Sequence, residues 1–255
     1  MDWVAIKKSI KKFLLIFNQA LSFLDLKIVR TNMQITQAEM KKNQDSILAC
    51  GVDKKAARRI FQYEKFLETR NLRDVAGREA VIIESGVGNG STLIFLLKLQ
   101  NYLGDRRAIY AFDSFEGFPG GSQNDSEEFL RLGKPDYKNF TLDFVKAKLR
   151  SHQISKDDVA RVEFIKGFIP DSLVSFSGAG VSLLNCDLDL YKPTKETLNF
   201  FWPFIVPGGV VMLDEYDIGN DQEKWPGAKK AIDEFCEEMS LQLHRGFGRR
   251  AFLKK

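Results

Sequence analysis

Short apolar runs alternate with segments of helical periodicity through most of this chain. The runs that predict strands lie at residues 79–84, 108–112, 162–166, 181–186 and 209–213, and the segments that predict helices lie at residues 92–103, 140–149, 194–201 and 228–239. The first run is apolar at consecutive positions, which suits a strand buried on both faces. Strands and helices that alternate in this way predict a parallel, doubly wound α/β sheet.

Further elements are expected on both sides of this region. Residues 45–75 have the pattern of helices with basic surfaces, and the tail predicts a β-hairpin from residues 241–244 and 250–253. The expected fold class is α/β, with a doubly wound, mostly parallel seven-stranded sheet, N-terminal helices and a C-terminal β-hairpin. The last expected helix carries four apolar residues on one face: Ala231, Ile232, Phe235 and Met239.

Length and composition narrow the class of protein. With 255 residues, 44% of them hydrophobic and 28% charged, the chain suits one soluble α/β domain and indicates neither disorder nor a polytopic membrane protein. Much of the net charge of +4 comes from the first thirty residues, so the rest of the chain gives no argument for nucleic-acid binding. The three cysteines are far apart and odd in number, which fits a reducing, cytoplasmic location better than a disulfide framework.

A glycine-rich turn joins the first expected strand to the first expected helix. Residues 84–92 read Glu-Ser-Gly-Val-Gly-Asn-Gly-Ser-Thr. Such a turn lets the backbone approach a ligand closely and leaves a helix N-terminus facing it. A dinucleotide-binding loop usually has its third glycine one position later, where this chain has Ser91. The shift favours a ligand without a pyrophosphate.

Two acidic residues at strand ends favour S-adenosylmethionine as that ligand. Asp113 ends the second expected strand, where a carboxylate can accept hydrogen bonds from the ribose hydroxyls of either S-adenosylmethionine or NAD. Glu84 ends the first strand and can face the cationic amino end of S-adenosylmethionine, whereas it would oppose a pyrophosphate. The alternative is a tight strand-to-helix turn flanked by ordinary strand-end carboxylates.

Three carboxylates follow the fourth and fifth expected strands and predict a magnesium site. Asp187 follows the fourth strand, and Asp214 and Glu215 follow the fifth, so all three should meet at the carboxyl edge of the sheet. Converging carboxylates repel one another unless a cation joins them, and oxygen ligands without histidine suit Mg²⁺ far better than Zn²⁺. The alternative is that some of them cap helices or bind lysines.

The same site should contain the group that accepts a proton. A bound divalent ion should acidify a substrate hydroxyl, and Asp187 or Asp189 could take the proton if it comes within hydrogen-bond reach. His152 and His244 do not follow a strand's carboxyl end, so we expect both on the surface. Residues 114–138, rich in Gly, Pro, Ser and Asp, are a candidate mobile lid.

Several segments together resemble the macrocin O-methyltransferase family. The segments are residues 84–91, Phe112-Asp-Ser-Phe-Glu-Gly-Phe-Pro119, Lys166-Gly-Phe168, Cys186-Asp-Leu-Asp-Leu-Tyr191, residues 207–216 and Gly227-Ala-Lys-Lys-Ala-Ile-Asp233. They span residues 75–240. Where the family usually has an aspartate pair, this chain has Asp214 followed by Glu215.

This resemblance implies a class I, magnesium-dependent enzyme that transfers a methyl group from S-adenosylmethionine to a hydroxyl of a sugar, on a glycan, glycolipid or glycosylated natural product. It implies Mg²⁺ on Asp187, Asp214 and Glu215, a homodimer, and the cofactor on Glu84, Gly86 and Asp113. The full set of cofactor-binding candidates is Glu84, Ser85, Gly86, Gly88, Gly90, Ser91, Thr92, Asp113, Ser114, Gly167, Phe168 and Asp187. Two alternatives stay open: an NAD-dependent oxidoreductase, although no Tyr-x-x-x-Lys pair is obvious, and a non-catalytic, membrane-associated protein that binds S-adenosylmethionine.

Residues 1–34 predict a basic amphipathic helix ahead of the domain at residues 35–255. Residues 3–24 would place an apolar stripe opposite four lysines, and the uncharged run at residues 13–24 is shorter than the roughly 20 residues of a membrane span. The helix could pack on its own domain or a second subunit, or residues 1–25 could contact the inner face of a membrane peripherally. A signal peptide is a further alternative, but an exported enzyme would lose access to a cytosolic cofactor.

Overall fold

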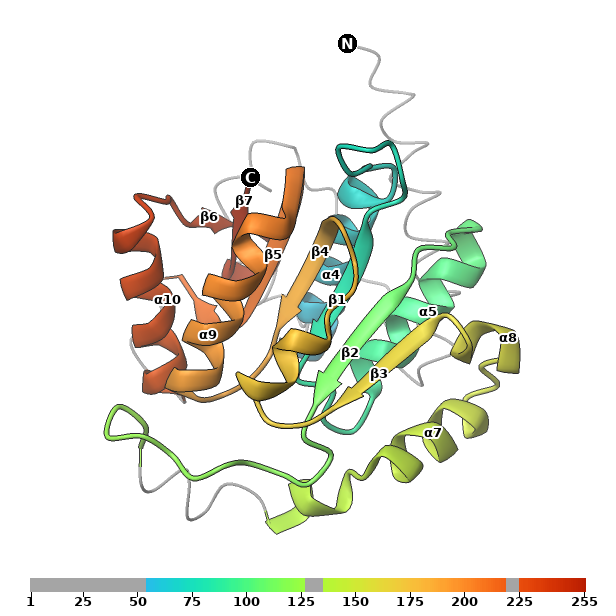
Figure 1. Cartoon of the computed structure of the whole chain (residues 1–255), viewed down its shortest axis with the longest axis horizontal. Coiled ribbons are helices and arrows are strands. Elements are labelled where there is room, and N and C mark those ends of the chain that lie inside the picture. The colour runs from blue at the N-terminus through green and yellow to red at the C-terminus, as the bar shows by residue number, and fades with distance from the viewer. Residues whose placement is uncertain (1–53, 127–134, 219–224) are drawn as a thin grey trace, which may run out of the picture. The chain divides into compact units, whose positions relative to one another are not determined.

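The computed structural model describes residues 54–126, 135–218 and 225–255 (Figure 1). The chain divides into two compact units, Met1–Ile60 and Phe61–Lys255. The description below concerns the second unit, together with residues 54–60 of the first, which begin a helix that continues into the second. The expected amphipathic helix and the expected boundary between residues 34 and 35 lie outside the described residues. In the described part of the chain, no helix is long and apolar enough to cross a membrane.

Seven strands form one sheet, in the spatial order β3-β2-β1-β4-β5-β7-β6. The strands are β1 (Val81–Ser85), β2 (Ile109–Asp113), β3 (Val162–Lys166), β4 (Val181–Cys186), β5 (Ile205–Asp217), β6 (His244–Arg245) and β7 (Arg250–Lys254). Strands β1 to β5 pair parallel with one another, whereas β7 pairs antiparallel with both β5 and β6. The mostly parallel, seven-stranded α/β fold is therefore confirmed.

Helices cover both faces of this sheet. They are α4 (Lys54–Thr69), α5 (Ser91–Leu103), α7 (Leu142–Ser151), α8 (Lys156–Val159), α9 (Tyr191–Phe201) and α10 (Pro226–Glu238), with short 3-10 turns at Pro135–Asn139, Asp171–Ser175, Trp202–Phe204 and Phe247–Arg249. Helices α9 and α10 lie together on the near face of the sheet in Figure 1, and α5 lies behind it. The carboxyl ends of the parallel strands point to the lower edge of that view, where residues 114–126 and α7 also lie.

The core lies between the central strands and these helices. Strands β1, β4 and β5 contribute side chains with no more than 1% exposure, such as Ile83, Leu184 and Val211. The ring of Phe176 packs edge-on against those of Phe201 and Phe204, with ring centres 5.2 Å apart in both pairs. This rigid core fixes the positions of the strand ends, which form the floor of the site described below.

The structure corrects several details of the sequence-based expectations, and the predicted bounds of β1, β2, α5, α7 and α9 shift by one to three residues. Strand β5 is longer at both ends than the predicted residues 209–213, and β6 begins three residues after the predicted start at residue 241. Met239 was predicted to share the buried face of the last helix, but α10 ends at Glu238, so Met239 caps the helix and is 47% exposed. The pattern of apolar spacing does not show where a helix ends.

Candidate active site at the carboxyl edge of the sheet

The register of the sheet sets acidic residues side by side. Ser85 of β1 pairs with Phe112 of β2 and with Cys186 of β4, and Cys186 pairs with Leu213 of β5. The next residue on β2, β4 and β5 is Asp113, Asp187 and Asp214 respectively. Three carboxylates that are far apart in the chain thus occupy one row at the carboxyl edge, as parallel strands require.

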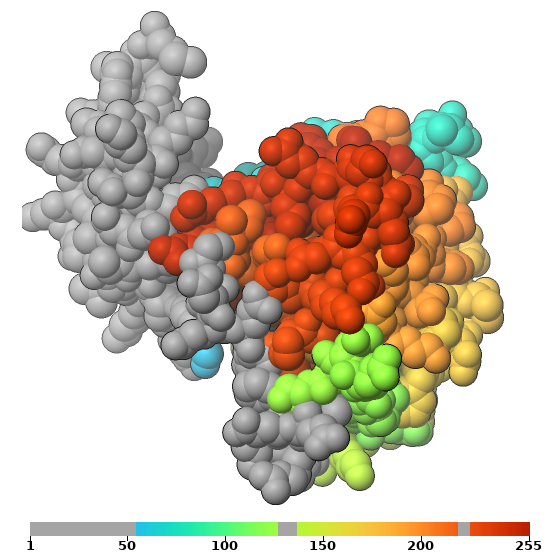
Figure 2. Space-filling model, turned by 90° about the vertical axis from the view of Figure 1, so that its left-hand side faces the viewer, coloured from blue at the N-terminus to red at the C-terminus, as the bar shows by residue number. Residues whose placement is uncertain are grey.

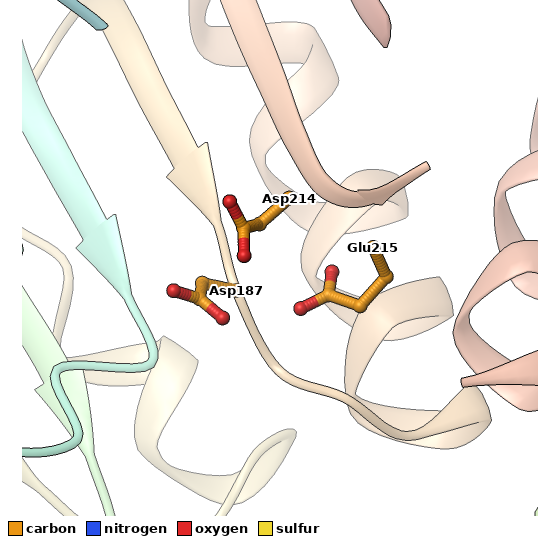
Figure 3. A group of neighbouring side chains, drawn as sticks. All are labelled: Asp187, Asp214 and Glu215. Carbon is orange, nitrogen blue, oxygen red and sulfur yellow. The ribbon is translucent and has the colours of Figure 1, made fainter. Parts of the chain in front are cut away.

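Asp187, Asp214 and Glu215 form a compact group. Each offers one carboxylate oxygen, and these oxygens all lie within 4.8 Å of one another. Figure 3 shows the three side chains directed toward a common space beyond the end of β4. The predicted convergence of these residues is therefore confirmed, including that of Glu215, which has a longer side chain than aspartate.

A bulge in β5 explains how two successive residues reach the same space. In a regular strand, neighbouring side chains point to opposite faces. The ladder between β5 and β7 pairs Leu213 with Ala251 and then Asp217 with Arg250, so residues 214–216 have no paired counterpart on β7. Such a bulge bends the strand and redirects its side chains, which lets both acidic residues of the bulge face the site.

Glu215 occupies the most unfavourable position for a negative charge. Both carboxylate oxygens of Glu215 are buried. Apart from a hydrogen bond with Asp187, which requires a proton between the two carboxylates, neither oxygen has a hydrogen-bond partner among the described residues. Burial raises the pKa of Glu215 well above its usual range, and the charges of Asp187, Asp214 and Asp189 add to this effect. A divalent cation would remove the conflict, so the group fits an oxygen-binding ion such as Mg²⁺.

Asp189 lies beside this group, as predicted. It is 9% exposed and has a positive φ of 64°, in the loop between β4 and α9. Its charge is among those that raise the pKa of Glu215. Cys186 ends β4 directly before Asp187, and its burial, together with the same three carboxylates, raises the pKa of its thiol well above the usual range. The thiol therefore stays protonated.

The three glycines of the loop after β1 have different surroundings. A Cβ on Gly86 would lie 1.8 Å from the carbonyl oxygen of Asp187, so this glycine allows the ends of β1 and β4 to approach. A Cβ on Gly90 would lie 3.1 Å from Val145 of α7. Gly88 has a φ of 51° and nothing within 4 Å of that position, so its face is the one open to a ligand.

Asp113 holds the same loop in place. Its carboxylate accepts hydrogen bonds from the backbone N–H of Gly88 at 2.9 Å and of Phe115 at 2.7 Å. Burial raises its pKa, and these backbone hydrogen bonds oppose the rise. Each carboxylate oxygen has a second lone pair, so contact with a ribose stays compatible with this arrangement.

Several other cofactor candidates use their side chains within the protein. The hydroxyl of Ser85 lies 3.4 Å from that of Thr197, and Thr92 is 5% exposed. Ser91 donates to Asn89 and accepts from Lys148, and Ser114 donates to the carbonyl oxygen of Gly117. These four residues offer a ligand chiefly their backbone. A Cβ on Gly167 would lie 3.1 Å from Ser172, and the neighbouring Phe168 is 38% exposed.

Comparison with known proteins agrees with this geometry. The family description of macrocin O-methyltransferase (TylF) matches residues 12–244. The chain belongs to the macrocin O-methyltransferase family.

Two curated relatives of this family member illustrate the range of similarity. One is the 8-demethyl-8-(2,3-dimethoxy-alpha-L-rhamnosyl)-tetracenomycin-C 4'-O-methyltransferase of Streptomyces olivaceus, 29% identical over 141 residues, or 54% of this chain and 53% of the relative. The other is the mycinamicin III 3''-O-methyltransferase of Micromonospora griseorubida, 26% identical over 176 residues, or 67% of this chain and 65% of the relative. The chain thus spans between about half and two thirds of the length of these relatives.

Solved structures show the same fold. The O-methyltransferase NovP has a TM-score of 0.61 and 20% identity, covering 78% of this chain and 80% of NovP. The calicheamicin methyltransferase CalS11 also has a TM-score of 0.61, with 23% identity, covering 93% of this chain and 90% of CalS11. The class I methyltransferase fold expected from the sequence is thereby confirmed for this member of the macrocin O-methyltransferase family.

A cavity that was not predicted opens beside Asp113. It has a volume of about 550 Å³ and is lined by Phe115, Glu116, Lys138, Thr141, Leu142, Asp143 and Lys166. Glu116 and Lys166 form an ion pair of 2.7 Å across strand ends, and both side chains are more than half exposed. Two residues that line this cavity could have been singled out from the sequence. Glu116 lies in the Asp-Ser-Phe-Glu-Gly-Phe-Pro segment, and Lys166 ends a predicted strand.

The candidate lid is attached to the helices next to the site. Asp125 accepts hydrogen bonds from the backbone N–H of Tyr191, at the start of α9, and from Ser122. A Cβ on Gly227, in the first turn of α10, would lie 2.0 Å from the Asp125 carboxylate. Figure 2 shows the green segment in contact with the orange and red surface over α9 and α10. Residues 114–126 therefore extend from β2 to these two helices.

The two histidines lie outside this group of residues. His244 is exposed and stacks on Phe252 with ring centres 5.2 Å apart, as expected for a surface residue. His152 is only half-exposed, and its ring lies 3.0 Å from the carbonyl oxygen of Lys148.

Proposed function

We propose that this protein transfers a methyl group from S-adenosylmethionine to a hydroxyl of a sugar, and that Mg²⁺ assists the reaction. The observation that carries this proposal is the group of Asp187, Asp214 and Glu215 beside the glycine loop, in a member of the macrocin O-methyltransferase family. The family match favours methyl transfer over hydride transfer to NAD.

The names of the relatives support a sugar as the acceptor. One acts on a tetracenomycin that carries a rhamnosyl group, and another on mycinamicin III, each as an O-methyltransferase. The acceptor class that we infer is therefore a sugar attached to a larger molecule: a glycosylated natural product, a glycan or a glycolipid.

The cofactor would lie along the ends of β1 and β2. Gly88 offers an open backbone face, and Asp113 is fixed by two backbone hydrogen bonds at a place where its remaining lone pairs can accept from ribose hydroxyls. Glu84 is completely buried at the end of β1 and can favour the cationic amino end of S-adenosylmethionine. Fixing donor and acceptor in this way can lower a barrier by roughly 7–11 kcal/mol in favourable cases.

Asp187, Asp214 and Glu215 would hold the Mg²⁺, which supplies acidification of the acceptor hydroxyl and stabilisation of the negative charge on its oxygen. Asp187 or Asp189 accepts the hydroxyl proton. The sulfur–methyl bond breaks as the oxygen–methyl bond forms, which leaves S-adenosylhomocysteine and a methyl ether. The burial of Asp189 and Glu215 keeps these charges out of bulk water, where they would be screened.

The proposal extends to the cellular setting. We infer a cytoplasmic homodimer in which residues 1–25 either pack on their own domain or a second subunit or contact a membrane peripherally. The support for membrane contact is the basic amphipathic pattern of those residues, and the support for a homodimer is the resemblance to the family.

Methyl transfer from isotopically labelled S-adenosylmethionine tests the proposal. The full chain is incubated with rhamnosyl glycosides and nucleotide-linked deoxysugars, with Mg²⁺ or with EDTA, and products are identified by mass spectrometry. We expect one added methyl on a sugar oxygen, with Mg²⁺ only, and loss of the product in Asp187→Asn. Transfer that persists in EDTA would contradict the role of the metal, and labelling confined to nitrogen or carbon would contradict the acceptor class.

A further inference from the structure

An arginine from the last strand contacts the bulge that carries two of the candidate metal ligands. Arg250 is the first residue of β7, and its side chain is 13% exposed. One guanidinium nitrogen, Nη1, donates to the backbone carbonyl of Asp214 at 2.6 Å and lies 3.2 Å from the Oδ1 of the same residue. Its Nε lies 3.5 Å from the carboxylate of Asp217, at the other end of the bulge.

These contacts span the irregular part of β5. Arg250 pairs with Asp217 in the ladder, while the next residue of β7 pairs with Leu213, so the arginine lies opposite the point where three extra residues leave the strand. A bulge disturbs the ladder locally and leaves its extra residues without a partner strand. The planar guanidinium can hold several acceptors in a fixed geometry, and here it joins the first residue of the bulge to the residue that ends it.

The bulge is also held by a second element, helix α10. Tyr216 donates its hydroxyl hydrogen to Asp233 of α10 at 2.7 Å, and Lys229 lies 4.9 Å from the Tyr216 ring centre. Glu215 lies between Asp214, which Arg250 holds, and Tyr216, which α10 holds. The direction of the Glu215 side chain therefore depends on both contacts, that of Arg250 with Asp214 and that of α10 with Tyr216.

We propose that Arg250 is a positioning residue, which holds the β5 bulge so that Asp214 and Glu215 face one ion. The inference rests on the proposed function, because it assumes that the three carboxylates bind a divalent ion. Arg250 acts through the carbonyl and carboxylate of Asp214. Groups that orient metal ligands in this way typically contribute 10- to 100-fold in metal affinity.

The charge and the geometry of Arg250 predict opposite effects of its removal. If only its charge mattered, removing a cation beside the site would strengthen the binding of another cation, since like charges repel. If its geometry matters, removal lets the bulge relax and weakens binding. Lysine keeps the charge but lacks the planar fork, so Arg250→Lys separates the two explanations.

Titration of the full chain with Mn²⁺, followed by electron paramagnetic resonance, tests the inference. We expect Mn²⁺ affinity to fall roughly 10- to 100-fold in both Arg250→Met and Arg250→Lys, while S-adenosylmethionine affinity stays within about twofold of wild type, which also shows that each variant is folded. Arg245→Met is the matched control, because Arg245 lies exposed on the adjacent edge strand, and it should bind Mn²⁺ as wild type does.

The outcomes of the Mn²⁺ titration distinguish the positioning role of Arg250 from the metal site itself. Unchanged or tighter Mn²⁺ binding in Arg250→Met, or full rescue by lysine, overturns the positioning role while leaving the metal site intact. Equal losses of Mn²⁺ and S-adenosylmethionine affinity would mean a general structural role and also overturn it. If wild type itself binds no Mn²⁺, the proposed metal site is wrong, and the inference falls with it.

Discussion

At Glu215 the structure conflicts with the electrostatics of a negative charge. A buried carboxylate next to other carboxylates is costly unless a proton or a cation compensates it. Its side chain, which is longer than that of aspartate, reaches the common space with Asp187 and Asp214. The conflict is resolved in a protein that binds a divalent ion at this position.

Replacing the Glu215 carboxylate should weaken metal binding without lowering the unfolding temperature of the metal-free protein. We expect Glu215→Gln to unfold at the same or a higher temperature than wild type without metal, because the amide removes a buried like charge. A ligand at about a hundred times its Kd stabilises a protein by about 2.7 kcal/mol, and the variant should lose most of this gain on addition of Mg²⁺. Thermal unfolding with and without Mg²⁺ measures both effects.

Glu163→Gln is the control for this experiment, because Glu163 is an exposed carboxylate on β3. It should retain the full stabilisation by Mg²⁺. An equal Mg²⁺ effect in wild type and Glu215→Gln would show that Glu215 does not bind the ion.

The sequence predicted some of these residues for a sound physical reason. Asp113, Asp187 and Asp214 could be placed together because each follows a buried parallel strand, and parallel strands end at one edge. Glu215 was also predicted to converge there, but the bulge that lets two successive residues face the same space has no clear pattern in the residues. Arg250 was missed because its role depends on the register of a hairpin, and sequence spacing does not fix that register.

At the scale of elements, the segment after β2 is attached to the starts of α9 and α10. Leu190, at the N-terminal end of α9, provides no side-chain cap, and Asp125 supplies the missing acceptor to the Tyr191 N–H. A carboxylate at this place also interacts favourably with the helix dipole. The loop after Asp187 leads directly into α9, so the attachment point adjoins the candidate metal ligands.

A methyl group at Gly227 should detach this segment. The added Cβ of Gly227→Ala would lie 2.0 Å from the Asp125 carboxylate, which must move away, and loss of such a cap typically costs about 1 kcal/mol. We expect faster hydrogen exchange in residues 114–126 and at the start of α9, and a higher KM for the acceptor. Hydrogen exchange with mass spectrometry and steady-state kinetics measure these changes.

The matched control is Gly120→Ala in the same segment, where an added Cβ meets nothing within 4 Å. It should exchange hydrogen as wild type does. If Gly227→Ala and Gly120→Ala behave alike, Asp125 does not hold the segment.

The bounds of some strands and helices could be predicted from sequence patterns, and those of others could not. The bounds of β3 and β4 were predicted without error, because their apolar runs end at polar residues or at a glycine. Strand β6 and the end of α10 were misplaced, since short edge elements and helix ends depend on tertiary contacts more than on periodicity. The four-residue helix α8 was not predicted, as it is too short to show helical periodicity.

At the scale of the whole molecule, the strand order of the sheet brings residues that are distant in the chain together in one site. The order β3-β2-β1-β4-β5-β7-β6 places the glycine loop of β1 between the strand ends that carry Asp113 and Asp187, with Asp214 one strand further. Strand β7 lies between β5 and the edge strand β6 and brings Arg250 to the bulge. The fold class was predictable from alternation alone, but the position of the last hairpin next to the site was not.

The central claim is that Asp187, Asp214 and Glu215 together bind one divalent ion in the active enzyme. Anomalous diffraction at the manganese absorption edge, from crystals of the full chain grown with Mn²⁺ and S-adenosylhomocysteine, tests it most directly. We predict one strong anomalous peak within coordination distance of a carboxylate oxygen from each of the three residues. A peak located elsewhere, or no peak in crystals whose three carboxylates are well ordered, would contradict the claim.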